Sequence, residues 1–420
     1  MKELLKKGAT LVLLGTGGVG KTTVAAALGL AAASCRLETA VITVDPARRL
    51  RDALGLERLG GKPMRLSAAR LSAAGLDPAL KLSAMVLDVK GAWDAMVERF
   101  ATDPATRHRI LDNPFYKNLT EQFAGSEAYA ALQQLYDISL SGEFEIEVVD
   151  TPPAAHAFEF IHAPARLTRL LDSRSARWLF MPYFTAGRFA MRLASRAARF
   201  IVRDIEHFAG ARVLSSISEF FVAASEAVDA VAERFHKTEA LLRSPAVRFI
   251  LVTTAEEDRL LQAQDLIEEM KAEGLHLSAI VINRFLDEES WQELSRSDNG
   301  VSGRLEEIGA LRGLLGSSLS RDAGMSALVD YLESYGERAR RDIVRVARFA
   351  HELPPSVKLA IAPEIKIGVR DLRALSHVAE FLVGAKLTPR HLDRIARSTK
   401  SGTSVGSGLM TSIETKKNET

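Results

Sequence analysis

Residues 10–23 read Thr-Leu-Val-Leu-Leu-Gly-Thr-Gly-Gly-Val-Gly-Lys-Thr-Thr, an apolar run followed by a glycine-rich loop. Gly15 is separated by four residues from Gly20-Lys21-Thr22, and an alanine-rich helical pattern follows at 22–33. Glycines let consecutive N–H groups converge on phosphate oxygens, and a helix N-terminus adds partial positive charge. The combination of strand, spacing and helix favours a phosphate-binding loop over an ordinary glycine-rich turn.

This loop supplies most of the candidate binding residues. We expect a nucleotide to be held by Gly15, Gly17, Gly18, Val19, Gly20, Lys21, Thr22 and Thr23. Lys21 would reach the β- and γ-phosphates, and the Thr22 hydroxyl would bind Mg²⁺. The expected cofactors are therefore a nucleoside triphosphate and Mg²⁺.

Composition sets broad limits on the chain. Its 420 residues suffice for one large α/β domain with insertions or for two domains, and 47% apolar residues allow a sizeable core. The net charge of +2 does not point to nucleic acid as a partner. A single cysteine, Cys35, excludes an intrachain disulfide and an all-cysteine metal site within one chain. This usage fits a reducing cytoplasm.

We expect neither a signal peptide nor a membrane-spanning helix. The segment 1–8 is short and basic, and it lacks an apolar stretch followed by a cleavage site. No run of 18 apolar residues occurs in the sequence.

Short apolar runs alternate with helical patterns, which predicts an α/β fold with a doubly wound, mostly parallel sheet and a helical insertion. The expected strands are Thr10–Leu14, Ala40–Val44, Leu71–Gly75, Glu145–Val149, Phe249–Thr253, Ala279–Ile282 and Val357–Ile361. Ligands bind at the carboxyl ends of such strands. The loop, Asp45, Asp150 and Asn283 each follow an expected strand, so they should meet at one edge of the sheet.

We divide the chain into four parts. Residues 1–156 and 246–396 would form the two parts of a nucleotide-binding core, and 157–245 a helical insertion that engages a client or partner. A further helical stretch is expected at 303–350. The polar segment 397–420 has the composition of a disordered tail.

Two aspartates follow apolar strands. Asp45 precedes Pro46 and could orient the attacking water, although an aspartate here could instead cap the next helix. Asp150 precedes Pro152-Pro153 and occupies the usual place of an acid near Mg²⁺.

Three motifs together carry a family resemblance: GTGGVGKTT at 15–23, VDPARRLRDAL at 44–54 and VVDTPPAAH at 148–156. In these motifs the chain resembles the arsenical pump-driving ATPases and their relatives that target tail-anchored membrane proteins. Both belong to the deviant phosphate-loop ATPases. Partition ATPases are less similar, because they usually carry Asp-Pro-Gln where this chain has Asp-Pro-Ala at 45–47.

The resemblance implies a role for each matching residue. Lys21 and Thr22 would hold phosphate and Mg²⁺. Asp45 would lie in switch I and activate water, and it is also a candidate metal ligand. Asp150 would lie in switch II near Mg²⁺, with His156 at the family's histidine position.

Two further residues are implied to contact the base. Asn283 matches an asparagine that reads adenine, and Pro363 falls in a loop that packs against adenine. Asparagine and proline after a strand are also ordinary turn residues. The resemblance further implies ATP as the nucleotide and a homodimer as the assembly.

The chain departs from the family pattern at Thr16, where the family has a lysine that reaches the partner subunit's nucleotide. Loss of a transition-state cation can cost about 10³–10⁵ in rate, as for an arginine finger. Hydrolysis would therefore be slow, or Arg48 or Arg49 would substitute for the lysine; alternatively both arginines are solvated surface charges. The lone Cys35 also cannot form the thiolate clusters of the arsenite-responsive members.

Within 157–245, arginines recur every three or four residues, forming a stripe on a helix. They are Arg188, Arg192, Arg196, Arg199 and Arg203. The stripe either contacts a membrane or a hydrophobic client, or belongs to an ordinary amphipathic helix docked on the core.

The preferred function is a Mg²⁺-dependent cytoplasmic ATPase, also able to sit at a membrane surface, that moves a helical subdomain against a membrane-protein client or membrane partner. The alternative is a nucleotide-binding scaffold that hydrolyses weakly or not at all, and Thr16 favours it. A partition-type ATPase acting on DNA is the third reading, weakened by the near-neutral charge.

Overall fold

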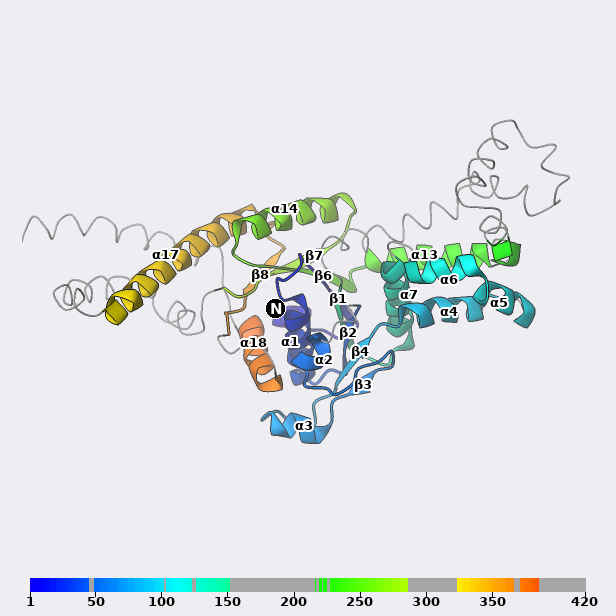
Figure 1. Ribbon diagram of the computed structural model, residues 1–420, viewed down its shortest axis with the longest axis horizontal. Coiled ribbons are helices and arrows are strands. Elements are labelled where there is room, and N and C mark those ends of the chain that lie inside the picture. Colours follow the sequence, from blue (N-terminus) through cyan, green and yellow to red (C-terminus); the bar gives the residue numbers. More distant parts are fainter. Residues whose placement is uncertain are drawn as a thin grey trace, which may run out of the picture.

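In the computed structural model, the described residues are 1–44, 49–101, 103–122, 126–151, 216, 219–220, 222–224, 227–285, 323–365 and 371–384. They form an eight-stranded sheet covered by helices on both faces (Figure 1). The strands are β1 (Ala9–Leu14), β2 (Thr39–Thr43), β3 (Met64–Arg65), β4 (Leu82–Val86), β5 (Ile146–Asp150), β6 (Val247–Thr253), β7 (Leu277–Ile282) and β8 (Lys358–Ile361).

The strand order is β3-β4-β2-β5-β1-β6-β7-β8, and every neighbouring pair is parallel except β3 with β4. This confirms the predicted doubly wound, mostly parallel α/β fold. The order places β5 between β1 and β2, although 131 residues separate the end of β1 from the start of β5 along the chain. The carboxyl ends of these three strands consequently lie together.

One face of the sheet packs against the alanine-rich helix α1 (Lys21–Ser34) and α18 (Leu372–Gly384). Leu11 and Leu13 of β1 point to this face. The alanines let α1 approach the sheet closely, and a Cβ at Gly29 would lie only 2.1 Å from Val41 of β2. The shorter α2 (Arg49–Ala53) and α3 (Ala68–Ala73) add Leu50 and Leu71 to the same cluster.

The other face carries the rest of the described helices and most of the aromatic core. They are α4 (Val89–Phe100), α5 (Pro104–Leu111), α6 (Pro114–Gln122), α7 (Ser126–Ser141), α13 (Val228–Leu242), α14 (Glu257–Ala272) and α17 (Ala323–Glu352). Helices α4–α7 and α13 gather beside one another, while α14 lies over the opposite half of the sheet and α17 extends outward beyond it (Figure 1). A 3₁₀ turn at Lys2–Leu4 precedes β1. None of the described helices is both long and apolar enough to cross a membrane.

The strand expected at Leu71–Gly75 was wrong. Residues 68–73 form α3, which Ser67 caps by accepting a hydrogen bond from the Arg70 backbone N–H, and Gly75 follows with φ +77°. Serine at an N-cap and a left-handed glycine after the last turn are helix signals. The strand instead occurs at β4, whose sequence Leu-Ser-Ala-Met-Val contains only one β-branched residue and therefore gave a weak strand pattern.

The predicted division of the chain stays a prediction. Of 157–245 the structure describes α13 and a few helical residues before it, and the arginine stripe and the tail 397–420 lie outside the described residues. The expected helical stretch at 303–350 is described from Ala323 onward and is helical there. Helices α4–α7 lie before residue 157, yet α4 and α7 pack against α13, so the helical layer draws on both segments.

Candidate nucleotide site

The glycine-rich loop runs between the end of β1 at Leu14 and the start of α1 at Lys21. Gly15 has φ +152°, and a Cβ at this position would lie 2.2 Å from the carbonyl oxygen of Val252 on β6. Only glycine fits such a close approach of two backbones. The loop therefore turns sharply against β6 before it enters the helix.

Lys21 is the first residue of α1, and its side chain folds back over the loop. Its Nζ donates to the carbonyl oxygens of Gly15 at 2.8 Å and Thr16 at 3.2 Å, and the residue is 7% exposed. The other predicted loop residues surround it: Val19 is buried, Gly17, Gly20, Thr22 and Thr23 are partly buried, and Gly18 is exposed. All eight thus lie in one loop and the first turn of α1.

Asp150 is the last residue of β5 and lies directly beside the start of α1. Its Oδ2 accepts hydrogen bonds from Thr22 Oγ1 at 2.7 Å and from Thr43 Oγ1 at 3.0 Å. The carboxylate is 1% exposed. Sequence reasoning missed Thr43, because a threonine inside a β-branched strand carries no signal that separates it from its neighbours.

The second predicted aspartate, Asp45, lies outside the described residues, as do Arg48 and His156. The strand end before it is described: the Val44 backbone N–H donates to the Asp150 carbonyl oxygen at 3.0 Å. The chain therefore reaches residue 44 at the same edge as Asp150. Arg49 begins α2 and is exposed.

Asn283 and Pro363 come from two neighbouring strand ends. The Ala362 N–H donates to Ile282 O, and the Phe285 N–H donates to Ala362 O, each at 3.0 Å. Both residues are buried, and Asn283 Nδ2 donates to the Val19 carbonyl oxygen of the loop at 2.8 Å. The structure thus brings the predicted base-contacting residues to the same edge of the sheet as the phosphate loop.

The oxygens at this edge suit a magnesium ion. Thr22 and Asp150 offer a hydroxyl and a carboxylate in direct contact, and Mg²⁺ prefers a few such hard oxygen ligands together with substrate phosphates and water. A cluster of three or more histidine, cysteine or acidic residues is absent from the described part of the chain. The site therefore fits a metal brought with a nucleotide better than a metal held by the protein alone.

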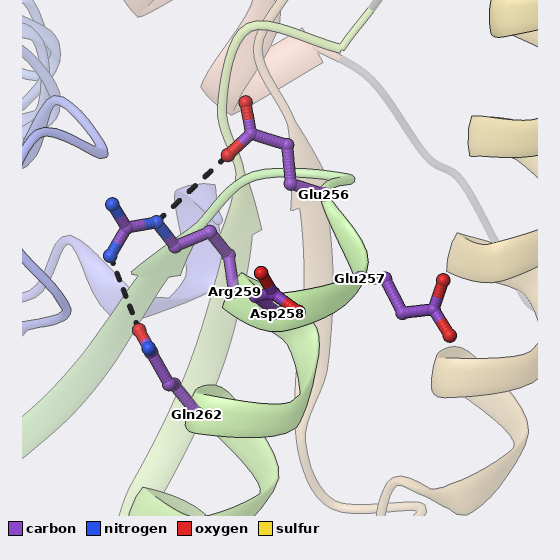
Figure 2. Close-up of a pocket in the computed structure, with 5 residues that line it drawn as sticks. All are labelled: Glu256, Glu257, Asp258, Arg259 and Gln262. Atoms are coloured by element: carbon purple, nitrogen blue, oxygen red, sulfur yellow. Dashed lines mark hydrogen bonds and ion pairs between the residues drawn. The ribbon is translucent and has the colours of Figure 1, made fainter.

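A pocket lies at the start of α14, shortly after the end of β6 (Figure 2). It is lined by Glu256, Glu257, Asp258, Arg259 and Gln262. Arg259 pairs with Glu256 at 3.9 Å and donates to Gln262 at 3.2 Å, while Glu257 turns toward α17 and pairs with Arg345 at 3.1 Å. Three of the five lining residues are acidic and only Arg259 is basic, so the lining disfavours phosphate and this pocket does not compete with the loop as the nucleotide site.

A parallel α/β sheet with a phosphate loop between its first strand and first helix defines a phosphate-loop NTPase. Residues 9–308 match the anion-transporting ATPase family. Among similar proteins, ATPase GET3 of Malassezia globosa is 24% identical over 274 residues, covering 65% of this chain and 71% of that protein. ATPase get3 of Aspergillus terreus is 25% identical over 274 residues, covering 65% and 72%.

Because the family match spans more than half of the sequence, the chain belongs to the anion-transporting ATPase family and is an ATPase of that family. The family resemblance inferred from the three motifs is thereby confirmed.

Proposed function

We propose that this chain hydrolyses ATP with Mg²⁺ at the loop edge of the sheet. The observation that carries the proposal is the contact between Thr22 Oγ1 and Asp150 Oδ2 beside the phosphate loop. Thr22 and Asp150 would hold the metal, which when bound neutralises charge on the phosphates. Lys21 would leave the carbonyls that it contacts now and bind the β- and γ-phosphates.

The attacking water requires a base or an orienting group close to the γ-phosphate. Asp45 is the proposed group, because the chain at Val44 is hydrogen-bonded to Asp150 and Asp45 follows directly. Lys21 and Asp45 are thus the proposed catalytic residues, and Asp45 is also a proposed metal ligand. Asn283 and Pro363 would contact the adenine base, which supports ATP as the nucleotide.

We further propose that nucleotide state is transmitted to a helical subdomain. The segment 152–227 follows Asp150 and Thr151 in the sequence, and the chain returns to the sheet through α13. Thr151 Oγ1 donates to Leu13 O at 2.6 Å, so this exit point is attached to β1 just before the loop. A change at the phosphates can therefore displace the start of that segment. Its proposed target is a membrane-protein client or membrane partner of a cytoplasmic homodimer.

Thr16 bears on the rate of hydrolysis. Its hydroxyl is buried and forms no hydrogen bond within the described part of the chain, and the side chain brings no positive charge to the loop. Slow turnover is the consequence that we propose. Arg49 is exposed at the start of α2. Arg49 and Arg48 therefore remain the proposed substitutes for the family lysine that Thr16 replaces. If both Arg48→Ala and Arg49→Ala keep wild-type turnover, neither arginine serves in that role.

The central test is release of inorganic phosphate by the purified full chain with Mg²⁺ and ATP. Turnover should fall by about 10²-fold or more in Lys21→Ala, because a positive charge on the transferred phosphoryl group is lost. Lys7→Ala is the matched control, since Lys7 is exposed and pairs only with Glu145 among the described residues. Equal turnover in wild type and Lys21→Ala would refute the proposed site.

Thr16 also supports a second candidate function, a nucleotide-binding scaffold with negligible hydrolysis. The same assay separates the two when combined with a nucleotide-binding measurement. Binding that Lys21→Ala weakens, without wild-type turnover above background, would favour the scaffold. A gain of turnover in Thr16→Lys would then show that the wild type hydrolyses poorly because it lacks a positive charge at this position.

A further inference from the structure

Asn283 lies at the end of β7, two strands away from β1, yet its side chain reaches the phosphate loop. The backbone N–H donates to Thr253 O of β6 at 2.8 Å, and the side-chain Nδ2 donates to Val19 O at 2.8 Å. The residue is 5% exposed. A buried asparagine anchored at both its backbone and its side chain has little rotational freedom.

The loop packs directly on this amide group. Gly20 has φ +90°, and a Cβ at Gly20 would lie 2.2 Å from Asn283 Nδ2. The Val19 carbonyl oxygen can only accept a hydrogen bond, so the amide atom facing it must be the nitrogen. The orientation of the Asn283 amide is thereby fixed by chemistry.

This contact acts on the peptide unit between Val19 and Gly20. In a trans peptide the C=O and the N–H point in opposite directions. Because Asn283 holds the Val19 carbonyl, the N–H of Gly20 is held pointing away from Asn283. A phosphate loop functions through such oriented N–H groups, and a loop whose peptide units can flip would lose binding free energy in ordering them.

We propose that Asn283 is a positioning residue of the phosphate loop, which fixes the Val19–Gly20 peptide unit for phosphate binding independently of any contact with the base. This inference rests on the proposed nucleotide site and adds a second role to Asn283. It predicts that Asn283 contributes to the binding of a phosphate chain that carries no base at all.

The test compares Mg²⁺-tripolyphosphate with Mg²⁺-ATP as ligands in calorimetric titrations of the full chain. Asn283→Ala should weaken tripolyphosphate binding about three- to tenfold, the value of one net hydrogen bond, and should weaken ATP binding at least as much. Ser278→Ala is the matched control, because Ser278 lies on the same strand at its far end and should leave both affinities unchanged.

A second measurement needs no ligand. Backbone hydrogen exchange in peptides that cover residues 15–24 should be faster in Asn283→Ala than in wild type, and unchanged in Ser278→Ala. Thermal unfolding of each variant checks that the comparison is made on folded protein. Faster exchange confined to this loop distinguishes a local positioning role from general loss of stability.

The outcomes separate this inference from the proposed function. If Asn283→Ala weakens ATP binding but leaves tripolyphosphate binding and exchange unchanged, Asn283 reads only the base, and the positioning role is wrong while the nucleotide site stands. If the wild type binds neither ligand, the proposed function fails. In that case the hydrogen-exchange measurement alone decides whether Asn283 holds the loop, and unchanged exchange in Asn283→Ala overturns the positioning role.

Discussion

The carboxyl edge of the sheet and the contact between α7 and α13 are both polar and both buried, but they are built differently. At the sheet edge, two threonine hydroxyls donate to one carboxylate oxygen of Asp150. Between the helices, Arg234 donates to Gln133 Oε1 at 2.6 Å, pairs with Asp137 at 2.7 Å and lies 5.0 Å from the centre of the Tyr136 ring.

The two regions differ in the partners that their polar side chains have within the chain. The charge of Arg234 is met by an acid, an amide and an aromatic ring of the chain itself, so the network holds two helices together. Among the described residues, the sheet edge combines a glycine-rich loop, two threonine hydroxyls and the carboxylate of Asp150, which are the groups that a phosphate and a hard cation require. Substitutions between α7 and α13 should therefore change stability, and substitutions at the sheet edge should change turnover.

The largest expected effect is on catalysis. Asp150→Asn should lower ATP turnover by about 10²-fold or more, because the proposed metal loses a charged ligand while the amide oxygen can still accept from Thr22. Phosphate release measures this. Asp137→Asn, the corresponding change in the helical network, should keep turnover within about twofold of wild type. A similar loss in both variants would abolish the distinction between the two regions.

Next in size is a stability effect. Arg234→Ala should lower the free energy of unfolding by about 2 kcal/mol, because the buried Gln133 side chain loses its donor and Asp137 loses a partner. Asp137 is 40% exposed and also pairs with Arg99, which moderates the loss. Urea unfolding provides the measurement, and Arg99→Ala, at an exposed pair, should cost at most about 0.5 kcal/mol. Collapse of turnover without loss of stability would contradict this view.

A smaller effect concerns the opposite end of β5. Glu147 is 6% exposed and accepts from Thr10 Oγ1 at 2.5 Å; burial raises the pKa of its carboxyl group, an effect that the Thr10 hydrogen bond partly opposes. The folded state therefore binds this proton more tightly than the unfolded state does. Its contribution to stability is present below the ordinary carboxyl pKa and is lost as the pH rises toward the raised value.

Glu147→Gln should consequently stabilise the protein at pH 8 by about 1 kcal/mol, the lower end of the penalty for a poorly compensated buried polar group. The advantage should shrink as the pH approaches 4. Urea midpoints of both proteins across this range test the expectation, and a difference that does not vary with pH would contradict it.

The smallest expected effect is at Thr43. Thr43→Val keeps the shape of the side chain but removes one hydrogen bond to Asp150, and turnover should fall about two- to fivefold. Thr39→Val is the matched control on the same strand, because the Thr39 hydroxyl donates to Leu37 O and not to the site. Unequal stability of the two variants, checked by urea unfolding, would have to be excluded first. Equal turnover in both would mean that Thr43 does not position Asp150.

Much of the site was predictable because each part is local in sequence. The glycine-rich loop at 15–20 lies between a strand and a helix as expected, Asn283 follows β7 as expected, and Asp150, expected directly after a strand, is the last residue of β5. The misassigned segment at 71–75 was not predictable from apolar content alone, since its leucine and alanines suit a helix equally well. Thr43 and Arg234 escaped prediction because each acquires its role through residues more than 90 positions away.

The sequence by itself determined the phosphate loop, because the spacing of its glycines, Lys21 and Thr22 fixes how the backbone can turn between β1 and α1. Only the tertiary structure decided that β5 inserts between β1 and β2, bringing Asp150 to 2.7 Å from Thr22 across 128 positions of the chain. The physical reason is that strand order minimises the free energy of the whole buried sheet and its two helical layers. That free energy depends on contacts along the whole chain, so no short motif could predict the strand order.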